Sequence, residues 1–295
     1  MGFGAMSDLF AFGLGYSAIE IGAILKAGGW RVSGTVRSTA KAAELEKEGM
    51  SPVLFDERGT VENALQTATH LLVSTPPGDK GDPALSAYSA AVRGAPALSW
   101  IGYLSTIGVY GDHHGDWVDE ETPTAAPRGR KSARVVAEQA WEALAKEREL
   151  PIDIFRLAGI YGPGRSPLDR IRAGDARRIV KHGQVFNRIH VEDIAQTIIA
   201  AIRRERRGGG SRLYNVGDDE PAPPQDVLLY AAELIGAPPP PEIPFDEAEL
   251  SPMARSFYED SKRIHNTKIK RELGVVLRYP TYREGLQALA QRIRY

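Results

Sequence analysis

The chain has 295 residues, with 37 lysines and arginines against 38 aspartates and glutamates, and 42% of the residues are hydrophobic. This near-neutral charge argues against a nucleic-acid-binding protein, and the hydrophobic content is too high for a disordered chain. The absence of cysteine excludes a disulfide framework, a thiolate metal site and a cysteine nucleophile.

Short apolar runs alternate with segments of helical spacing through the first half of the chain. The spacing predicts helices over residues 17–27, 40–47, 61–68, 83–93 and 132–149. The apolar runs predict strands over residues 9–12, 31–36, 53–55, 70–74, 97–104 and 152–157. Strands that alternate with helices of about 10–15 residues indicate βαβ units, and we therefore expect an α/β fold with a doubly wound parallel sheet.

The pattern loosens after Tyr161. Gly162-Pro163-Gly164 marks a loop, and the four prolines at 238–241 predict an extended stretch. A helix over 191–203 and a strand over 212–216 are the regular elements expected between them. We predict a dinucleotide-binding domain over residues 1–160, to which 186–217 return. A smaller, discontinuous C-terminal substrate domain takes in 161–185 and 218–295.

A glycine pattern, G-x-G-x-x-A, follows the first predicted strand at Gly13, Gly15 and Ala18. In a βαβ unit the first glycine permits a tight turn and the second lets the backbone approach a pyrophosphate. The amides that open the following helix favour an anion. We therefore expect a dinucleotide at Gly13, Gly15, Tyr16 and Ser17.

The end of the second predicted strand indicates which dinucleotide is bound. An acid at this position accepts a hydrogen bond from the ribose of NAD, whereas this chain carries Arg37 and Ser38 there and has no acid before Glu44. A guanidinium and a hydroxyl suit a 2′-phosphate, so we expect NADP, with NAD as the alternative. Further cofactor contacts are expected at the ends of the third and fourth strands, from Asp56, Ser74, Thr75 and Pro76.

Four spaced motifs resemble those of extended short-chain dehydrogenases/reductases of the NAD-dependent epimerase/dehydratase family. They lie at residues 104–111 (LSTIGVYG), 156–165 (RLAGIYGPGR), 189–195 (IHVEDIA) and 214–217 (YNVG). The resemblance spans about residues 9–290 and implies a Rossmann domain with a substrate domain built mainly from C-terminal segments. It also places Ser105 beside the cofactor and Thr106 at the position of the family's catalytic Ser/Thr, where its hydroxyl would polarise a carbonyl.

The chain departs from the family at its catalytic pair, a Tyr-x-x-x-Lys on the helix after the V-Y-G segment. Glu138 matches the acid that follows this pair, which puts Arg130 at the tyrosine position and Arg134 at the lysine position. Arginine stays protonated at working pH, so Arg130 cannot donate and recover a proton. Arg134 is still expected to bond the ribose or phosphates. Tyr110 and Tyr161 are the tyrosines available as relocated acids, and packing the loop against the sheet is the alternative role of both.

Three interpretations follow from this departure. The protein performs redox chemistry with a relocated acid, or hydride transfer proceeds while water or a substrate group handles the proton. In the third, the protein binds NADP without turnover, as a regulatory or interaction protein. The sequence does not identify the substrate, for which we expect a small carbonyl compound or a nucleotide sugar.

The remaining partners follow from what the sequence lacks. The first 25 residues contain no Lys or Arg, unlike the start of a signal peptide, and no apolar run reaches the ~18 residues that span a bilayer. We expect a cytoplasmic protein with a small-molecule substrate and neither nucleic-acid nor membrane partners. A homodimer through the helix over 132–149 is a candidate arrangement. No metal site is expected, because the adjacent His113 and His114 on a loop diverge.

Overall fold

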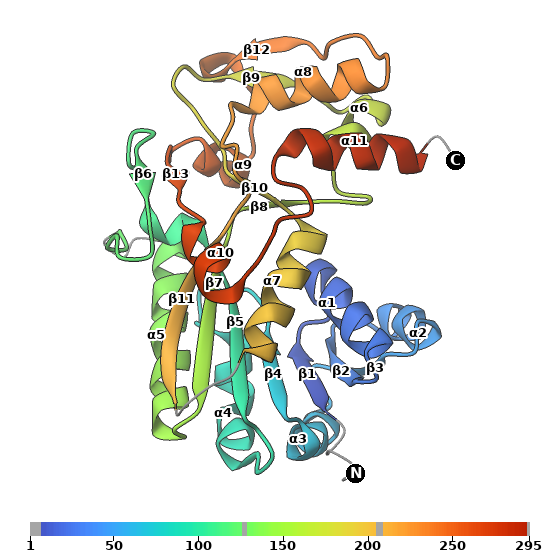
Figure 1. The fold of residues 1–295 in the computed structure, drawn as a ribbon, viewed down its shortest axis with the longest axis vertical. Coiled ribbons are helices and arrows are strands. Elements are labelled where there is room, and N and C mark those ends of the chain that lie inside the picture. Colours follow the sequence, from blue (N-terminus) through green and yellow to red (C-terminus); the bar gives the residue numbers. More distant parts are fainter. Residues whose placement is uncertain (1–6, 126–128, 205–208, 294–295) are drawn as a thin grey trace. The chain divides into compact units, whose positions relative to one another are not determined.

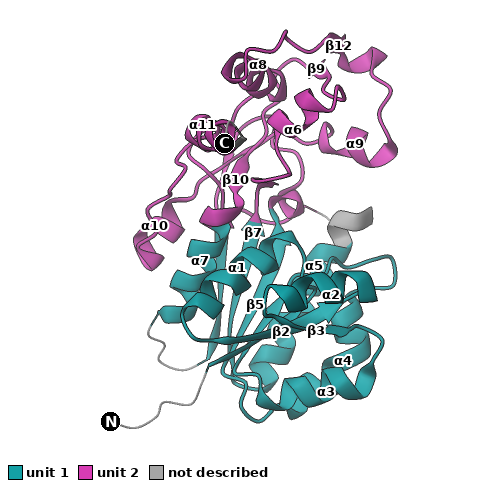
Figure 2. Cartoon of the chain, turned by 90° about the vertical axis from the view of Figure 1, so that its right-hand side faces the viewer, with its two compact units in different colours: residues 1–106, 126–156, 194–214 teal, residues 107–125, 157–193, 215–295 magenta. Residues whose placement is uncertain are grey.

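The computed structural model describes residues 7–125, 129–204 and 209–293, with the side chains of 129–132 and 293 excluded. The chain divides into two compact units, coloured separately in Figure 2. The first comprises residues 1–106, 126–156 and 194–214, and the second comprises 107–125, 157–193 and 215–295. The second unit therefore takes in residues 107–125, which we expected to belong with residues 1–160.

The first unit is built on a seven-stranded sheet in the order β11-β7-β5-β4-β1-β2-β3 (Figure 1). The four pairings β1–β2, β2–β3, β1–β4 and β4–β5 are parallel. Residues 9–12 of β1 are fully buried, as expected for a strand covered on both faces. The strands are β1 (Asp8–Phe12), β2 (Arg31–Val36), β3 (Ser51–Leu54), β4 (His70–Val73), β5 (Trp100–Thr106), β7 (Pro151–Leu157) and β11 (Gly210–Val216).

Helices cover both faces of this sheet. One buried core joins side chains of β1, β4 and β5 to side chains of α3, α4 and α5, and α1, α2 and α7 are the other helices that flank the sheet (Figure 1). Asp82 caps α4 by accepting from the amide of Leu85 at 3.0 Å. The helices are α1 (Tyr16–Ala27), α2 (Thr39–Lys47), α3 (Arg58–Thr67), α4 (Pro83–Gly94), α5 (Gly129–Glu147) and α7 (Val191–Arg203).

The predicted doubly wound fold is confirmed, and the predicted elements are present with shifted ends. The fifth strand, expected from residue 97, begins at Trp100, and α3 and α5 likewise begin three residues from their expected starts. Residues 96–97 form a turn, and Leu98 is buried without belonging to a strand. Apolar character alone therefore misplaced the start of this strand.

The second unit consists of short elements. Its pairs of strands, β8 with β10, β9 with β12 and β6 with β13, are parallel. A core joins Tyr161 and Leu168 to apolar side chains of α8 and α11. The elements are β6 (Trp117–Val118), β8 (Gly159–Tyr161), α6 (Pro167–Arg172), β9 (Arg178–Val180), β10 (Arg188–His190), α8 (Pro224–Leu234), β12 (Glu242–Pro244), α9 (Pro252–Phe257), β13 (Arg263–Ile264), α10 (Thr267–Leu273) and α11 (Tyr282–Ile293).

None of the helices in the described part of the chain combines the length and the apolar character needed to cross a membrane.

Candidate functional site

The turn between β1 and α1 is tight for reasons that can be read from its contacts. Gly13 has a φ of +89°, and a Cβ added there would lie 3.0 Å from Cγ2 of Thr75. The amide of Gly13 donates to Oγ1 of Thr35 at 2.8 Å, and the amide of Leu14 donates to the Thr35 carbonyl at 2.8 Å. Position 13 therefore needs glycine for its backbone conformation and for its close approach to the end of β4.

The N-terminal end of helix α1, which follows this turn, has open space beside Gly15. Gly15 is the N-cap of α1, no side chain in the described part of the chain caps this end of the helix, and the first turn of α1 contains no acid. A Cβ added at Gly15 would meet nothing within 4 Å. The first amides of a helix lack intrahelical acceptors, and the helix dipole favours an anion at this end. These features fit a dinucleotide pyrophosphate at Gly15, Tyr16 and Ser17.

An unpaired buried hydroxyl lies beside this turn. Oγ1 of Thr75 is buried and has no hydrogen-bond partner among the described residues. Thr75 follows β4, and its amide donates to the Phe12 carbonyl at 3.1 Å, which fixes it against the end of β1. Its neighbour Ser74 also donates to Phe12, at 2.9 Å, and Pro76 is exposed. An unsatisfied hydroxyl at this edge is consistent with the expected cofactor contact from Thr75.

The side chains expected to recognise the adenosine half lie at the ends of β2 and β3. Arg37 and Asp56 are both exposed. Ser38 caps α2, with its Oγ accepting from the amide of Lys41 at 3.3 Å, so its hydroxyl proton can still be donated. Arg37 therefore offers a solvent-exposed cation directly after β2.

The segment at the end of β5 is anchored by a buried polar network within the first unit. Oγ of Ser105 donates to Oε1 of Glu138 at 2.5 Å. Arg156 donates two hydrogen bonds to the same carboxylate, from Nη2 to Oε2 at 2.8 Å and from Nε to Oε1 at 3.2 Å. The side chains of Arg156 and Glu138 are 7% and 5% exposed. Ser105 is thus oriented toward Glu138, and Thr106, the last residue of β5, is half-buried.

Arg134, which the sequence predicts at the position of the family's lysine, contacts strand β5. Its Nη1 donates to the Leu104 carbonyl at 2.9 Å and lies 3.5 Å from the hydroxyl of Tyr103. Burial raises the pKa of Tyr103 to about 12, so this phenol stays protonated. Arg134 therefore has a defined position beside the end of β5. The side chain of Arg130, which the sequence predicts at the family's tyrosine position, lies outside the described side chains.

The two candidate tyrosine acids belong to the second unit. The hydroxyl of Tyr110 donates to Oδ1 of Asn215 at 2.7 Å, and the amide of Asn215 donates to Oε1 of Glu120 at 2.8 Å. Burial raises the pKa of Glu120. Tyr161 belongs to the core of this unit, with its hydroxyl 3.5 Å from the Thr281 carbonyl, and burial raises its pKa. These contacts favour packing roles for both tyrosines.

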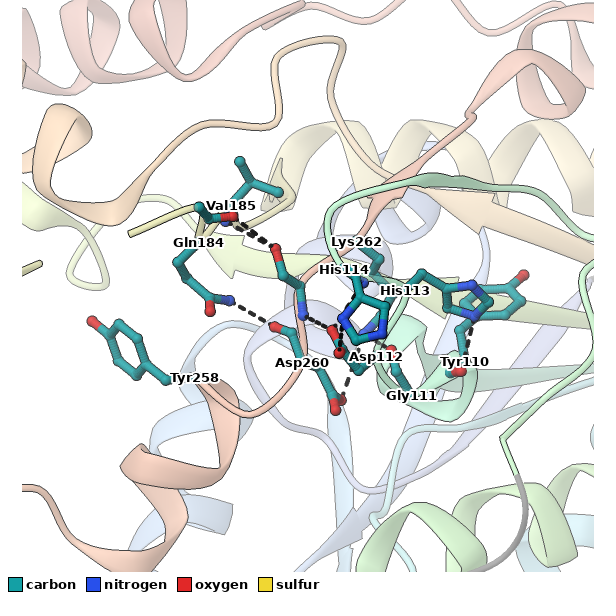
Figure 3. A network of polar contacts seen from close by, with 12 residues as sticks. Tyr110, Gly111, Asp112, His113, His114, Gln184, Val185, Tyr258, Asp260 and Lys262 are labelled. Carbon is teal, nitrogen blue, oxygen red and sulfur yellow. Dashed lines mark hydrogen bonds and ion pairs between the residues drawn. The ribbon is translucent and has the colours of Figure 1, made fainter. Parts of the chain in front are cut away.

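The histidine-containing loop belongs to a polar network in the second unit (Figure 3). Asp112 accepts from the amide of Ser261 at 2.7 Å and pairs with Nδ1 of His114 at 2.9 Å. Nζ of the buried Lys262 donates to the Gly111 carbonyl at 2.6 Å. The network therefore ties the loop to residues 261–262. Within the described ranges, no group of three or more His, Cys, Asp or Glu side chains is arranged to hold a metal ion.

Comparison with known proteins agrees with this architecture. Residues 91–217 match the model of the NAD-dependent epimerase/dehydratase family. The chain is 30% identical to Protein YeeZ of Escherichia coli K12, over 93% of this chain and 97% of that protein. It is 28% identical to a 3-diazoavenalumate denitrifying reductase of a Streptomyces species, over 89% of this chain and 93% of that one. A solved structure of a functionally unknown conserved protein from Silicibacter pomeroyi DSS is 49% identical, with a TM-score of 0.89 and coverage of 97% and 99%.

Proposed function

The chain belongs to the NAD-dependent epimerase/dehydratase family, and on that premise we propose that it is an NADP-binding oxidoreductase. Its substrate in this proposal is a small carbonyl compound or a nucleotide sugar, and it works without the family's Tyr-x-x-x-Lys pair. The observation that carries the proposal is the turn at Gly13 and Gly15, which opens an uncapped helix toward free space. Arg37 favours the 2′-phosphate of NADP over the bare hydroxyl of NAD.

In this proposal, residues of the first unit have separate roles in binding the cofactor and in catalysis. A bound nicotinamide dinucleotide supplies or accepts a hydride. Thr106 hydrogen-bonds the reacting oxygen, Thr75 donates to the cofactor, and Arg134 keeps a positive charge beside the end of β5. A cation near a developing alkoxide lowers the energy of the transition state. Water then delivers the proton, because arginine cannot cycle between its charged and neutral forms.

Deuteride transfer to a panel of candidate substrates tests this proposal. The purified protein is incubated with 4-deuterated NADPH and a set of aldehydes, ketones and UDP-sugars, and products are analysed by mass spectrometry. We expect one deuterium in the product of at least one panel member and a rate at least ~10² lower in Thr106→Val, in line with the loss of one transition-state hydrogen-bond donor. Transfer that is unchanged in Thr106→Val would remove Thr106 from the mechanism.

A non-catalytic NADP-binding protein is the second candidate, and a specific observation favours it. Tyr110 is bonded to Asn215, and Tyr161 is enclosed in a core, so neither candidate acid is in a setting that suits proton transfer. Tight NADP binding with no deuterium transfer across the whole panel supports this second function. Failure to bind either NADP or NAD contradicts both candidates.

A further inference from the structure

A cavity of about 330 Å³ lies at the opposite end of β1 from the glycine turn. Its lining includes Asp8, Arg31 and Ser51, which are the first residues of β1, β2 and β3. Gly13 is five residues beyond Asp8, roughly 16 Å along an extended strand. The cavity is therefore separate from the expected pyrophosphate position. Its volume is at the lower end of the range for ligand pockets, about 300–1,000 Å³, which suits a small molecule and excludes a dinucleotide.

Two cations in the cavity wall are held in place, and only one of them is paired with a carboxylate. Nζ of Lys26 donates to the Glu48 carbonyl at 2.5 Å, and within the described part of the chain no carboxylate pairs with it. Arg31 contributes Nη2 to Oδ2 of Asp8 at 3.0 Å, while its side chain remains 53% exposed. Thr67 donates to the same Asp8 oxygen at 3.0 Å and so fixes the counterion. The remaining N–H groups of Arg31 and the ammonium of Lys26 are available to an anion.

The sum of these charges limits the ligand's charge. Lys26 and Arg31 carry two positive charges, and Asp8 carries one negative charge, which leaves a net charge of +1. A monoanion balances it, whereas a phosphate dianion would overcompensate it. The carbonyls at the end of α1 do not oppose an anion strongly, because the amides of Gly28 and Trp30 already donate to Ile24 and Leu25 at 3.1 Å.

An aromatic wall limits the ligand's shape. Trp30 lines the cavity and is half-buried, and its ring lies 4.8 Å from the ring of His70. Trp30 thus brings a flat aromatic side chain to the same cavity wall as Lys26 and Arg31. Ser33 and Ser51 also line the cavity. A planar body with one carboxylate matches the charge, the flat wall and the volume together.

We propose that this cavity binds a small organic monoanion, a carboxylate on a planar body, at a site distinct from the cofactor turn. The proposal does not depend on the proposed oxidoreductase activity. Benzoate is the probe, benzyl alcohol is the neutral compound of similar shape, and inorganic phosphate represents the other anion class. Each is titrated calorimetrically into the full-length protein, with and without saturating NADP.

The expected result is binding of benzoate that is at least tenfold tighter than that of benzyl alcohol or phosphate and unchanged by NADP. Lys26→Gln should weaken benzoate binding at least tenfold, and Lys26→Arg should largely retain it. Lys47→Gln is the matched control, because Lys47 is an exposed lysine near the end of α2 that does not line the cavity. Equal thermal midpoints of the variants establish that they are folded.

Four results would overturn the proposal: no heat with benzoate, equal binding of benzyl alcohol, tighter binding of phosphate, or displacement of benzoate by NADP. Unchanged affinity in Lys26→Gln would equally remove the cavity as the site. Because NADP binding is measured separately on the same protein, failure of the cofactor assignment is distinguishable from failure of this one.

Discussion

Arg156 meets Glu138 in a two-point contact in which Nη2 lies 2.8 Å and Nε 3.2 Å from the two carboxylate oxygens. The contact joins β7 to α5 beneath the end of β5, and Ser105 adds a third hydrogen bond to the same carboxylate. Both charged side chains are almost completely buried, so the ion pair compensates for the water that each charge loses on folding. Glu138 therefore has a structural role in the first unit.

Glu138→Gln is expected to destabilise the protein strongly. The substitution removes the carboxylate charge that pairs with the buried Arg156 guanidinium, and breaking a buried pair costs about 3–5 kcal/mol in the free energy of unfolding. Urea denaturation measures it. Glu147→Gln is the control: it breaks the Arg93–Glu147 pair, whose side chains are 44% and 56% exposed, and an exposed pair contributes at most ~1 kcal/mol. Equal losses in the two variants would contradict the assigned role of Glu138.

The two glycines of the turn are predicted to respond differently to substitution. Gly13→Ala places a side chain at a φ of +89° and 3.0 Å from Thr75, so we expect a loss of about 1–3 kcal/mol in stability together with weaker NADP binding. Gly15→Leu meets no atom within 4 Å at its Cβ and should leave the thermal midpoint unchanged while abolishing NADP binding. If Gly15→Leu binds NADP normally, the phosphate-turn assignment is incorrect.

The residue after β2 is predicted to determine the choice between the two dinucleotides. Arg37→Asp replaces an exposed cation with an acid that repels a 2′-phosphate and accepts from a ribose hydroxyl. We expect NADP affinity to fall at least tenfold, about 1.4 kcal/mol, and NAD affinity to rise. Isothermal titration of both cofactors measures the change, with Arg58→Asp, an exposed arginine at the start of α3, as the control. An unchanged NADP to NAD ratio would show that Arg37 does not contact the 2′-phosphate.

The parts of this fold that could be predicted from the sequence are those with local signals. Residues 9–12 form an uninterrupted apolar run because β1 is covered on both faces, and Gly13 marks its end. In contrast, β6 has two residues and β8 three, too few to show any periodicity. The sequence of α11 carries a helical signal, because Leu286, Leu289 and Ala290 follow one another at helical spacing. All three side chains are buried in the structure, but we did not predict this helix.

The same distinction explains what was predicted of the site. The turn at Gly13 and Gly15 is a contiguous pattern, and its conformation follows from the residue types. The contact between Glu138 and Arg156 joins residues that are 18 positions apart on a helix and a strand, and no sequence pattern showed that the two charges meet. The cavity beside Lys26 and Trp30 is formed by several elements and has no local signal.

His190 is buried in the second unit in a setting that opposes its protonation. Its ring lies between Tyr161 and Tyr279, at centroid distances of 5.1 and 4.1 Å. Nδ1 accepts from the amide of Glu192 at 3.2 Å, and Nε2 is buried with no hydrogen-bond partner in the described ranges. Burial lowers the pKa of His190 to about 4 from its ordinary value of 6.5.

This depressed pKa predicts a loss of stability in mild acid. Between about pH 6.5 and 4 the unfolded chain binds a proton at this histidine that the folded protein does not, so the free energy of unfolding falls as the pH falls. Above pH 6.5 both states are neutral and the full stability is present. The loss is roughly 1–3 kcal/mol by pH 4. Urea denaturation from pH 7.5 to 4.5 measures it against His190→Phe, which keeps an aromatic ring but cannot titrate. We expect a shallower pH dependence in the variant, and parallel curves would show that His190 is not the responsible group.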